Sequence, residues 1–241
     1  MYALDCLGGP TWFKLGDRDL ATHVERTHRL LMGQSLSAVT RYLCTRLGIE
    51  HSIAPMTDDE VRTIIRSDVG TLEFQQYFVA RRCEPRVLAV EFRGAVMARP
   101  SIALSEALDS RDLSAIIICP SNPILSIEPI LHVGDVRRRI SQYRAPVVAV
   151  SPIVGGKALK GPAAKILLEM GLQPTAFEVA CSYGDLIDGI VIDSCDTALT
   201  EQIESLGLHV MVTDAIMKNR HDRRRLANQL SNLPLRFQNE V

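Results

Sequence analysis

The sequence lacks the features that mark a membrane or secreted protein. It has no apolar run of the roughly 18–20 residues that a membrane span needs. Its N-terminus has no basic flank followed by an apolar segment, so we expect no secretory signal. The formal net charge of −1 gives no overall attraction to nucleic acid or to an anionic membrane. We therefore expect a cytoplasmic protein that binds neither, with its basic clusters Arg137–Arg139 and Arg223–Arg225 on solvated helix faces.

Several classes of site are also missing. The six cysteines stand at positions 6, 44, 83, 119, 181 and 195, and none forms a CxxC pair. This spacing predicts reduced thiols rather than a disulfide framework or a zinc site. No HExxH motif, GxSxG elbow, GxGxxG fingerprint or Walker A sequence is present. These absences argue against a hydrolase or a dinucleotide oxidoreductase built on such motifs.

What is present is the pattern of an α/β protein. The chain has 241 residues, of which 46% are hydrophobic and 23% charged, as in ordinary globular proteins. After Pro100 the pattern predicts strands at 114–119, 146–150, 189–193 and 208–212. A helix at 101–109 is predicted to precede the first strand, and further helices are predicted between and after the strands, at 134–143, 162–170, 175–187, 196–206 with Asp196 as N-cap, and from Asp222 onward. Three βα repeats in a row predict a Rossmann-like, three-layer parallel sheet with helices on both faces.

The residues before Pro100 are less regular. A helical segment is predicted to begin within 12–20 and to run through His23 and Arg26 toward Leu31, and an amphipathic helix at 35–47 ends before Gly48. A short strand is predicted at 51–56, followed by Thr57–Glu60, which has the composition of a helix N-terminus. We interpret residues 58–100 as an inserted mixed subregion. Within it the pattern at 72–80 fits a helix or a strand, and the alternation at 86–94 favours a strand.

The first candidate ligand loop follows the strand predicted at 114–119, whose branched apolar residues are typical of a strand buried on both faces. The loop, 120–130, carries three prolines, two serines and an asparagine. Ligands of open α/β sheets bind beyond the carboxyl ends of the strands, which favours a ligand role for Ser121, Asn122 and Ser126. The alternative is that the prolines end the strand and that Ser121 and Asn122 only cap the next helix.

A second candidate loop follows the strand at 146–150. It combines Gly155, Gly156 and Gly161 with lysines at 157, 160 and 165 and a helix N-terminus. Glycines allow a close backbone approach, and a helix N-terminus offers free N–H groups to an anion. The alternative is a flexible loop whose lysines are solvated.

Three acidic features remain open. Asp17-Arg18-Asp19 is either a solvated helix start or an arginine held by acids toward a polar ligand. Asp58-Asp59 has the paired carboxylates that suit Mg²⁺, although helix N-terminal acids are the simpler interpretation. Asp193 and Asp214 each end a predicted strand, where they either face a site or cap the following turn.

Four stretches, taken in order, resemble the 2-phospho-L-lactate transferase family of coenzyme F420 biosynthesis. They are LGDRDLATH from Leu15, PMTDD from Pro55, PSNPILSIEPIL from Pro120 and VSPIVGGKALKGPA from Val150. Two C-terminal stretches, Leu186–Asp193 and Val212–Met217, fit the family pattern as well. The resemblance runs from about Leu15 to the end of the chain.

The resemblance implies a transferase. A phospholactyl, phosphoenolpyruvyl or related group would move from a guanosine-diphospho donor to the terminal ribityl hydroxyl of the deazaflavin Fo, releasing GMP. Such phosphoryl transfer uses positioning and charge stabilisation, here with Mg²⁺ as cofactor. The resemblance also implies a possible homodimer. It assigns no catalytic residue and does not choose the donor acid.

The resemblance also implies site residues. Substrate binding would fall to Asp17, Arg18, Asp19, Thr57, Asp58, Asp59, Ser121, Asn122, Pro123 and Ser126. The nucleotide and phosphate side would be formed by Ser151, Gly155, Gly156, Lys157, Lys160 and Gly161.

One departure from the family pattern leads to an alternative. Family members begin with a strand and a GGTGG-type loop, followed by an aspartate-rich metal-binding segment, and neither stands before Leu15 here. We therefore expect 1–241 to be a single transferase domain that is N-terminally truncated relative to the family and holds no metal acids of its own. The alternatives are a non-catalytic nucleotide-sugar-binding regulator of the gluconeogenesis-factor type and an inactive fragment.

The resemblance makes a first prediction about Arg18. The Arg18→Ala variant should weaken Fo binding more than it lowers thermal stability, because a solvated arginine contributes little to folding. A fluorescence titration with Fo and a thermal unfolding curve measure the two effects. An unchanged titration would remove Arg18 from the site.

Overall fold

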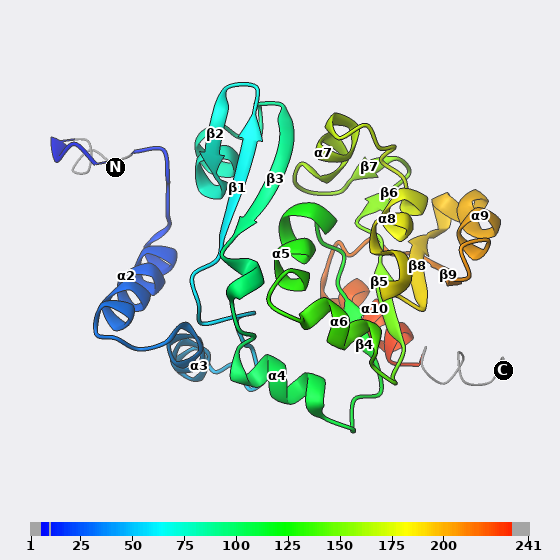
Figure 1. Cartoon of the computed structure of the whole chain (residues 1–241), viewed down its shortest axis with the longest axis horizontal. Coiled ribbons are helices and arrows are strands. Elements are labelled where there is room, and N and C mark those ends of the chain that lie inside the picture. The colour runs from blue at the N-terminus through cyan, green and yellow to red at the C-terminus, as the bar shows by residue number, and fades with distance from the viewer. Residues whose placement is uncertain (1–5, 10, 233–241) are drawn as a thin grey trace. The chain divides into compact units, whose positions relative to one another are not determined.

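The chain folds into two compact units, Met1–Glu106 and Ala107–Val241, in a computed structural model that describes residues 6–9 and 11–232 (Figure 1). The boundary falls inside helix α4 (Ile102–Asp109). Compact units do not decide whether the chain evolved as one domain, so the single domain with an insert at 58–100 stays a prediction. Within the described residues, no helix combines the length and the apolar character of a membrane span.

The first unit begins with two helices. Helices α2 (Asp17–Leu31) and α3 (Leu36–Arg46) lie where the sequence predicts them. The Ser35 hydroxyl caps α3 by accepting from the N–H of Ala38, and Gly48 beyond its end adopts φ +68°. Arg29 of α2 bonds to Glu25 at 2.7 Å and lies over the ring of Tyr42 of α3, which joins the two helices. None of the α2 residues is buried.

A small antiparallel sheet follows, in the order β2-β1-β3. Strand β1 (Arg62–Ser67) forms a hairpin with β2 (Gly70–Glu73) and pairs on its other side with β3 (Val87–Arg93). The strand predicted at 86–94 is therefore confirmed. The ambiguous stretch 72–80 divides between the end of β2 and a single π-helical turn, Gln76–Ala80.

Two predictions between 51 and 60 are wrong. Residues 51–56 form no strand, and no helix follows Thr57; the chain enters β1 instead. The β-branched run in Thr63-Ile64-Ile65 favours a strand, and the sheet buries both isoleucines. The polar residues that resemble a helix start serve loop contacts: the Asp58 carboxylate accepts from the N–H of Ser37 at 2.6 Å, in the first turn of α3.

The second unit holds a four-stranded parallel sheet in the order β4-β5-β8-β9. Its strands are β4 (Ile116–Ile118), β5 (Val147–Val150), β8 (Gly189–Asp193) and β9 (His209–Thr213). The predicted parallel α/β sheet is confirmed. The expectation that the first strand is buried on both faces is wrong, because β4 is an edge strand and Ile116 and Ile117 are only half-buried.

Helices cover the sheet on both sides. Leu226 and Leu230 of α10 (Arg220–Ser231) pack on one face against Val148, Val150 and Val191. Neighbouring side chains along a strand point to opposite faces, so Ala149 and Ile190 are buried on the other face. That side carries α6 (Val136–Ser141) and α8 (Ala176–Tyr183) (Figure 1). Helix α10 begins two residues before the predicted Asp222, which instead completes a capping box with Asn219.

The remaining elements of the second unit are short. A π-helical turn, Pro123–Ile127, leads into α5 (Glu128–Leu131). Strands β6 (Ile153–Val154) and β7 (Lys157–Ala158) form a hairpin before α7 (Ala163–Glu169). The helix predicted at 196–206 divides into a 3₁₀ helix, Ser194–Leu199, and α9 (Thr200–Glu204). Its N-cap is Asp193, not Asp196, whose buried carboxylate accepts from the N–H of Gly155.

Gly94 gives a test of the packing between the end of β3 and the residues before β1. It has φ +85°, and a Cβ there would lie 2.5 Å from the Glu60 carbonyl oxygen. The Gly94→Ala variant should lose more unfolding free energy than the ~1–2 kcal/mol of left-handed strain alone. The control is Gly48→Ala, where φ is +68° and no atom lies within 4 Å. Equal losses in urea unfolding would show that the close approach is not a constraint.

Candidate functional site

A cleft of about 620 Å³ lies at the carboxyl edge of the parallel sheet. Three loops form it, those that follow β4, β5 and β9, together with the first residues of α7 and α10. The carboxyl ends of parallel strands meet at one edge, so loops far apart in the sequence converge there. The lining residues are Pro120, Ser121, Asn122, Ser151, Pro152, Leu159, Lys160, Ala163, Ala215, Ile216, Met217, Lys218 and Arg223.

The loop after β4 is organised by Asn122. Its side-chain oxygen accepts from the N–H groups of Ile124 and Leu125, both at 3.0 Å, so it caps the turn that follows. Its side-chain nitrogen is buried and has no hydrogen-bond partner among the described residues. A buried donor without a partner costs about 1–3 kcal/mol, which a ligand oxygen in the cleft would offset. Asn122 therefore has the capping role, and its ligand role stays a prediction; Ser121 beside it lines the cleft.

Pro123 and Ser126 lie outside that lining. Pro123 is buried as the first residue of the π-helical turn, and Ser126 is exposed on it. The structure thus brings two of the four predicted residues of this loop into the cleft.

The glycine-rich loop after β5 serves mainly as a hairpin. Gly155 and Gly156 have φ +56° and +74° and form the tight turn between β6 and β7, which requires left-handed backbone. Gly155, Gly156, Lys157 and Gly161 are exposed and do not line the cleft. Lys160 does line it.

Ser151 also lines the cleft, but its hydroxyl is engaged locally. It donates to the carbonyl of Ile153 at 2.9 Å and accepts from the N–H of the same residue at 3.1 Å. Ser151 therefore shapes the cleft wall through the turn that it closes.

The loop after β9 contributes residues that sequence reasoning missed. Ala215–Lys218 and Arg223 form one wall of the cleft. Arg223 is exposed, as the sequence predicts. Its side of α10 is not simply solvated, however, because Arg223 lines the cleft. One feature of the sequence pointed to these residues: the stretch Val212–Met217, which fits the family pattern, covers the end of β9 and the start of this loop. Among the neighbouring basic residues, Arg225 instead bonds to Asp214 and Arg137 to Glu128, so neither cluster is uniformly solvated.

The cleft is positively charged. Lys160, Lys218 and Arg223 are its charged lining residues, and none of their side chains bonds to another described residue. No carboxylate stands in the lining. Unpaired cations beside the apolar residues Ala215, Ile216 and Met217 of this wall favour an anionic ligand with an apolar part.

Comparison with known proteins assigns the family. A model of the family described as 2-phospho-L-lactate transferase CofD matches residues 9–230. The chain belongs to the 2-phospho-L-lactate transferase family. It is 39% identical over 214 residues to a phosphoenolpyruvate transferase of Streptomyces griseus, covering 87% of this chain and 67% of that protein. It is 38% identical over 219 residues to a 2-phospho-L-lactate transferase of Haloarcula marismortui, covering 91% and 62%.

A solved structure shares the fold. A member of the UPF0052 family from Bacillus halodurans superposes with a TM-score of 0.56 at 11% identity, covering 81% of this chain and 66% of that one. At this identity the likeness concerns the fold alone. The chain spans about two thirds of the length of these relatives, between 62% and 67% for the two transferases named above.

The other predicted residues of this transferase-family chain belong to the first unit. Asp17, Arg18 and Asp19 are exposed in the first turn of α2. The Thr57 hydroxyl donates to the Arg99 carbonyl at 2.6 Å. These residues stay predicted substrate contacts.

Asp58 and Asp59 each have a structural contact in the same unit. Asp58 accepts from the N–H of Ser37 at 2.6 Å, and Asp59 accepts from the N–H of Arg99 at 2.7 Å. One oxygen of each carboxylate is therefore occupied by backbone. Their part in substrate binding stays a prediction too.

The cleft residues do not fit a magnesium site. Mg²⁺ prefers carboxylate oxygens, and the lining provides only hydroxyl and amide oxygens. The described residues contain no group of three or more His, Cys, Asp and Glu side chains able to hold a metal. The described residues that line the cleft therefore provide no carboxylate ligand for the predicted Mg²⁺.

Asp193 holds the loop after β9 in place. Its carboxylate is buried and accepts from the N–H of Cys195 at 3.1 Å and from the N–H of Ala215 at 2.9 Å. Burial raises the pKa of this carboxyl, but the N–H donors of Cys195 and Ala215, together with the Cys195 thiol and the charge of Arg225, hold the pKa below its ordinary value. Asp193 is thus a positioning residue for the cleft wall. Burial and Asp193 raise the pKa of Cys195 to about 11, so this thiol is no nucleophile at neutral pH.

The Asp193→Asn variant should lower the unfolding free energy by roughly 1–3 kcal/mol, because its amide NH₂ would face one of the two N–H donors. At this chain length the melting temperature should fall by roughly 2–4 °C per kcal/mol. The pKa of Asp193 is lower in the folded than in the unfolded protein, so the ionised carboxylate stabilises the fold at pH values above its unfolded pKa of about 4. This stabilisation is lost as the pH falls through the folded-state pKa. The difference in melting temperature between wild type and variant should therefore be largest at pH 7 and become smaller in strong acid. Calorimetry measures this, with exposed Asp185→Asn as control; equal melting temperatures at pH 7 would contradict it.

Proposed function

We propose that the protein transfers a phospholactyl, phosphoenolpyruvyl or related group from a guanosine-diphospho donor to Fo in coenzyme F420 biosynthesis. The oxygen of the terminal ribityl hydroxyl of Fo forms a bond to the outer phosphorus of the donor. The bond from that phosphorus to the oxygen of GMP breaks, GMP leaves, and the hydroxyl proton is released to solvent or base.

The observation that carries the proposal is the positive cleft at the carboxyl edge of the sheet, within a chain of the 2-phospho-L-lactate transferase family. A volume of about 620 Å³ lies within the range of about 300–1,000 Å³ that is typical of small-molecule sites. The diphosphate is the negatively charged part of the donor, which the cations of the cleft would bind. The apolar lining residues Ala215, Ile216 and Met217 suit a base or a deazaflavin ring.

The roles of individual residues follow from charge and placement. Negative charge develops on the transferred phosphoryl group and on the departing GMP, so Lys160, Lys218 and Arg223 would stabilise the transition state. The unpartnered amide of Asn122 would donate to a phosphate or substrate oxygen. The family-like residues Asp17, Arg18, Asp19, Thr57, Asp58 and Asp59 remain our proposal for Fo binding.

The donor acid stays open in this proposal. Relatives named phosphoenolpyruvate transferase and 2-phospho-L-lactate transferase are equally similar to the chain, at 39% and 38% identity. Mg²⁺ dependence and a homodimer are proposals from the family resemblance alone.

The transfer is tested by incubating the purified protein with Fo, Mg²⁺ and each guanosine-diphospho donor in turn. We expect a donor-dependent Fo adduct and an equal amount of GMP by liquid chromatography, and loss of both when EDTA is added. Donor binding without any adduct would contradict a transferase and favour the non-catalytic binder.

The cleft is tested in the same assay by Lys160→Gln and Arg223→Gln. Each should lower kcat/KM for the donor roughly ten- to hundredfold, since charge-assisted hydrogen bonds contribute about 1.5–3 kcal/mol. The matched control is Arg224→Gln, an exposed neighbour of Arg223 outside the cleft lining. Equal effects of cleft and control variants would show that the donor phosphates bind outside the cleft.

A further inference from the structure

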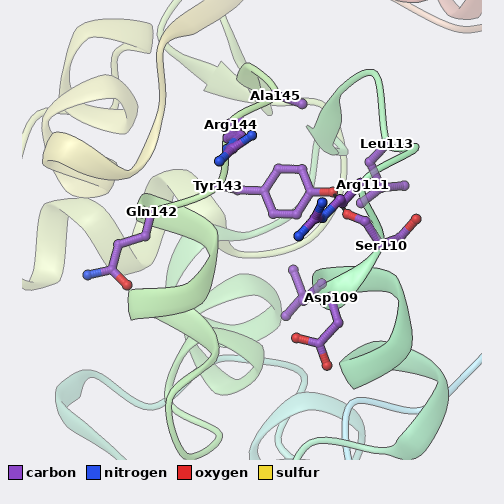
Figure 2. Close-up of a pocket in the computed structure, with 9 residues that line it drawn as sticks. Asp109, Ser110, Arg111, Leu113, Gln142, Tyr143, Arg144 and Ala145 are labelled. Carbon is purple, nitrogen blue, oxygen red and sulfur yellow. Dashed lines mark hydrogen bonds between the residues drawn. The ribbon is translucent and has the colours of Figure 1, made fainter.

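A second hollow, of about 260 Å³, lies at the opposite edge of the parallel sheet (Figure 2). Two segments form it: the end of α4 with the residues that lead into β4, and the residues between α6 and β5. We call it the amino-edge pocket. Its lining residues are Leu108, Asp109, Ser110, Arg111, Leu113, Gln142, Tyr143, Arg144 and Ala145.

The walls of the amino-edge pocket are tied together. The Tyr143 hydroxyl donates to the Ser110 carbonyl and so joins the two segments. Just below, the N–H of Ile116 donates to the Pro146 carbonyl at 2.9 Å where β4 and β5 begin. In Figure 2 the Tyr143 ring lies at the centre of the pocket, with Arg111 and Arg144 on either side in this view. The hollow is therefore a feature of the sheet edge and not a gap in a loose loop.

The charge of the pocket is unbalanced. Its one acid, Asp109, is engaged by Arg139 from α6, with 2.6 Å between Arg139 Nη2 and Asp109 Oδ1. Arg111 and Arg144 are exposed, and neither side chain bonds to another described residue. Two guanidinium groups thus border the pocket, and the carboxylate in its described lining is already paired with Arg139.

We propose that the amino-edge pocket binds a small phosphate-bearing anion. Guanidinium groups pair with phosphate oxygens through two parallel hydrogen bonds, and arginine is favoured where phosphate is recognised in this way. The volume of about 260 Å³ lies just below the range of about 300–1,000 Å³ for drug-sized ligands, so it suits an inorganic phosphate, a diphosphate or a short phosphate ester. A complete nucleotide is larger than this space.

The pocket is separate from the cleft. The cleft begins where β4 and β5 end, and the amino-edge pocket lies where the same strands begin. The four residues of β5, Val147–Val150, span about 13 Å at 3.3 Å per residue. A ligand that fits one site cannot reach the other, so the proposal does not depend on the transferase reaction.

The test uses inorganic pyrophosphate as probe and calorimetry at constant ionic strength. The cleft is first disabled by Lys160→Gln with Arg223→Gln, and we expect one binding site to remain. Adding Arg111→Gln or Arg144→Gln should weaken that site at least fivefold. The matched control is Arg224→Gln, which removes the same charge from an exposed arginine that lines neither the pocket nor the cleft.

Each outcome decides the proposal. Weakened binding in the two pocket variants with retention in Arg224→Gln supports it, and so does partial retention by Arg111→Lys, which keeps the charge. No binding in the cleft-disabled protein, or equal weakening by all three glutamine variants, overturns it. Thermal unfolding of each variant shows whether it is folded, and failure of the Fo transfer assay leaves this result unaffected.

Discussion

Parallel pairing of β4, β5, β8 and β9 is the constraint on which the second unit depends. Because all four strands run in one direction, their carboxyl ends meet at one edge and their amino ends at the other. The cleft gathers the loops after β4, β5 and β9, and the amino-edge pocket gathers the segments before β4 and β5. Two hollows at opposite edges of the sheet follow from a single topological fact.

Two buried aspartates hold the cleft's loops to that edge. Asp193 at the end of β8 accepts from the N–H of Ala215 beyond β9, and Asp196 accepts from the N–H of Gly155 beyond β5. Backbone donors satisfy both carboxylates, which lets acids stand near a cationic cleft without entering its lining. The loops are therefore positioned from the strand between them, and the charged side chains in the described lining of the cleft are Lys160, Lys218 and Arg223.

The residues that line the cleft differ from those that the sequence motifs predict for the phosphate side. Gly155 and Gly156, which resemble a phosphate cradle, are the turn of the β6–β7 hairpin. Lys218 and Arg223, which no motif singled out for phosphate, line the cleft. Asn122 caps its own turn with one end of its amide and leaves the other end without a partner.

The sequence by itself determined the parallel strands, most helix positions and the family, because hydrophobic period, capping residues and ordered motifs are local signals. It failed at 51–60, where Thr57 and Asp58 look like a helix start but bond to residues 42 and 21 positions away. It also failed for β4, since strand order decides which strand is an edge. Only the tertiary structure decided which cations share a cleft, because Lys160 and Arg223 are far apart in the chain and meet only through the pairing of β5, β8 and β9.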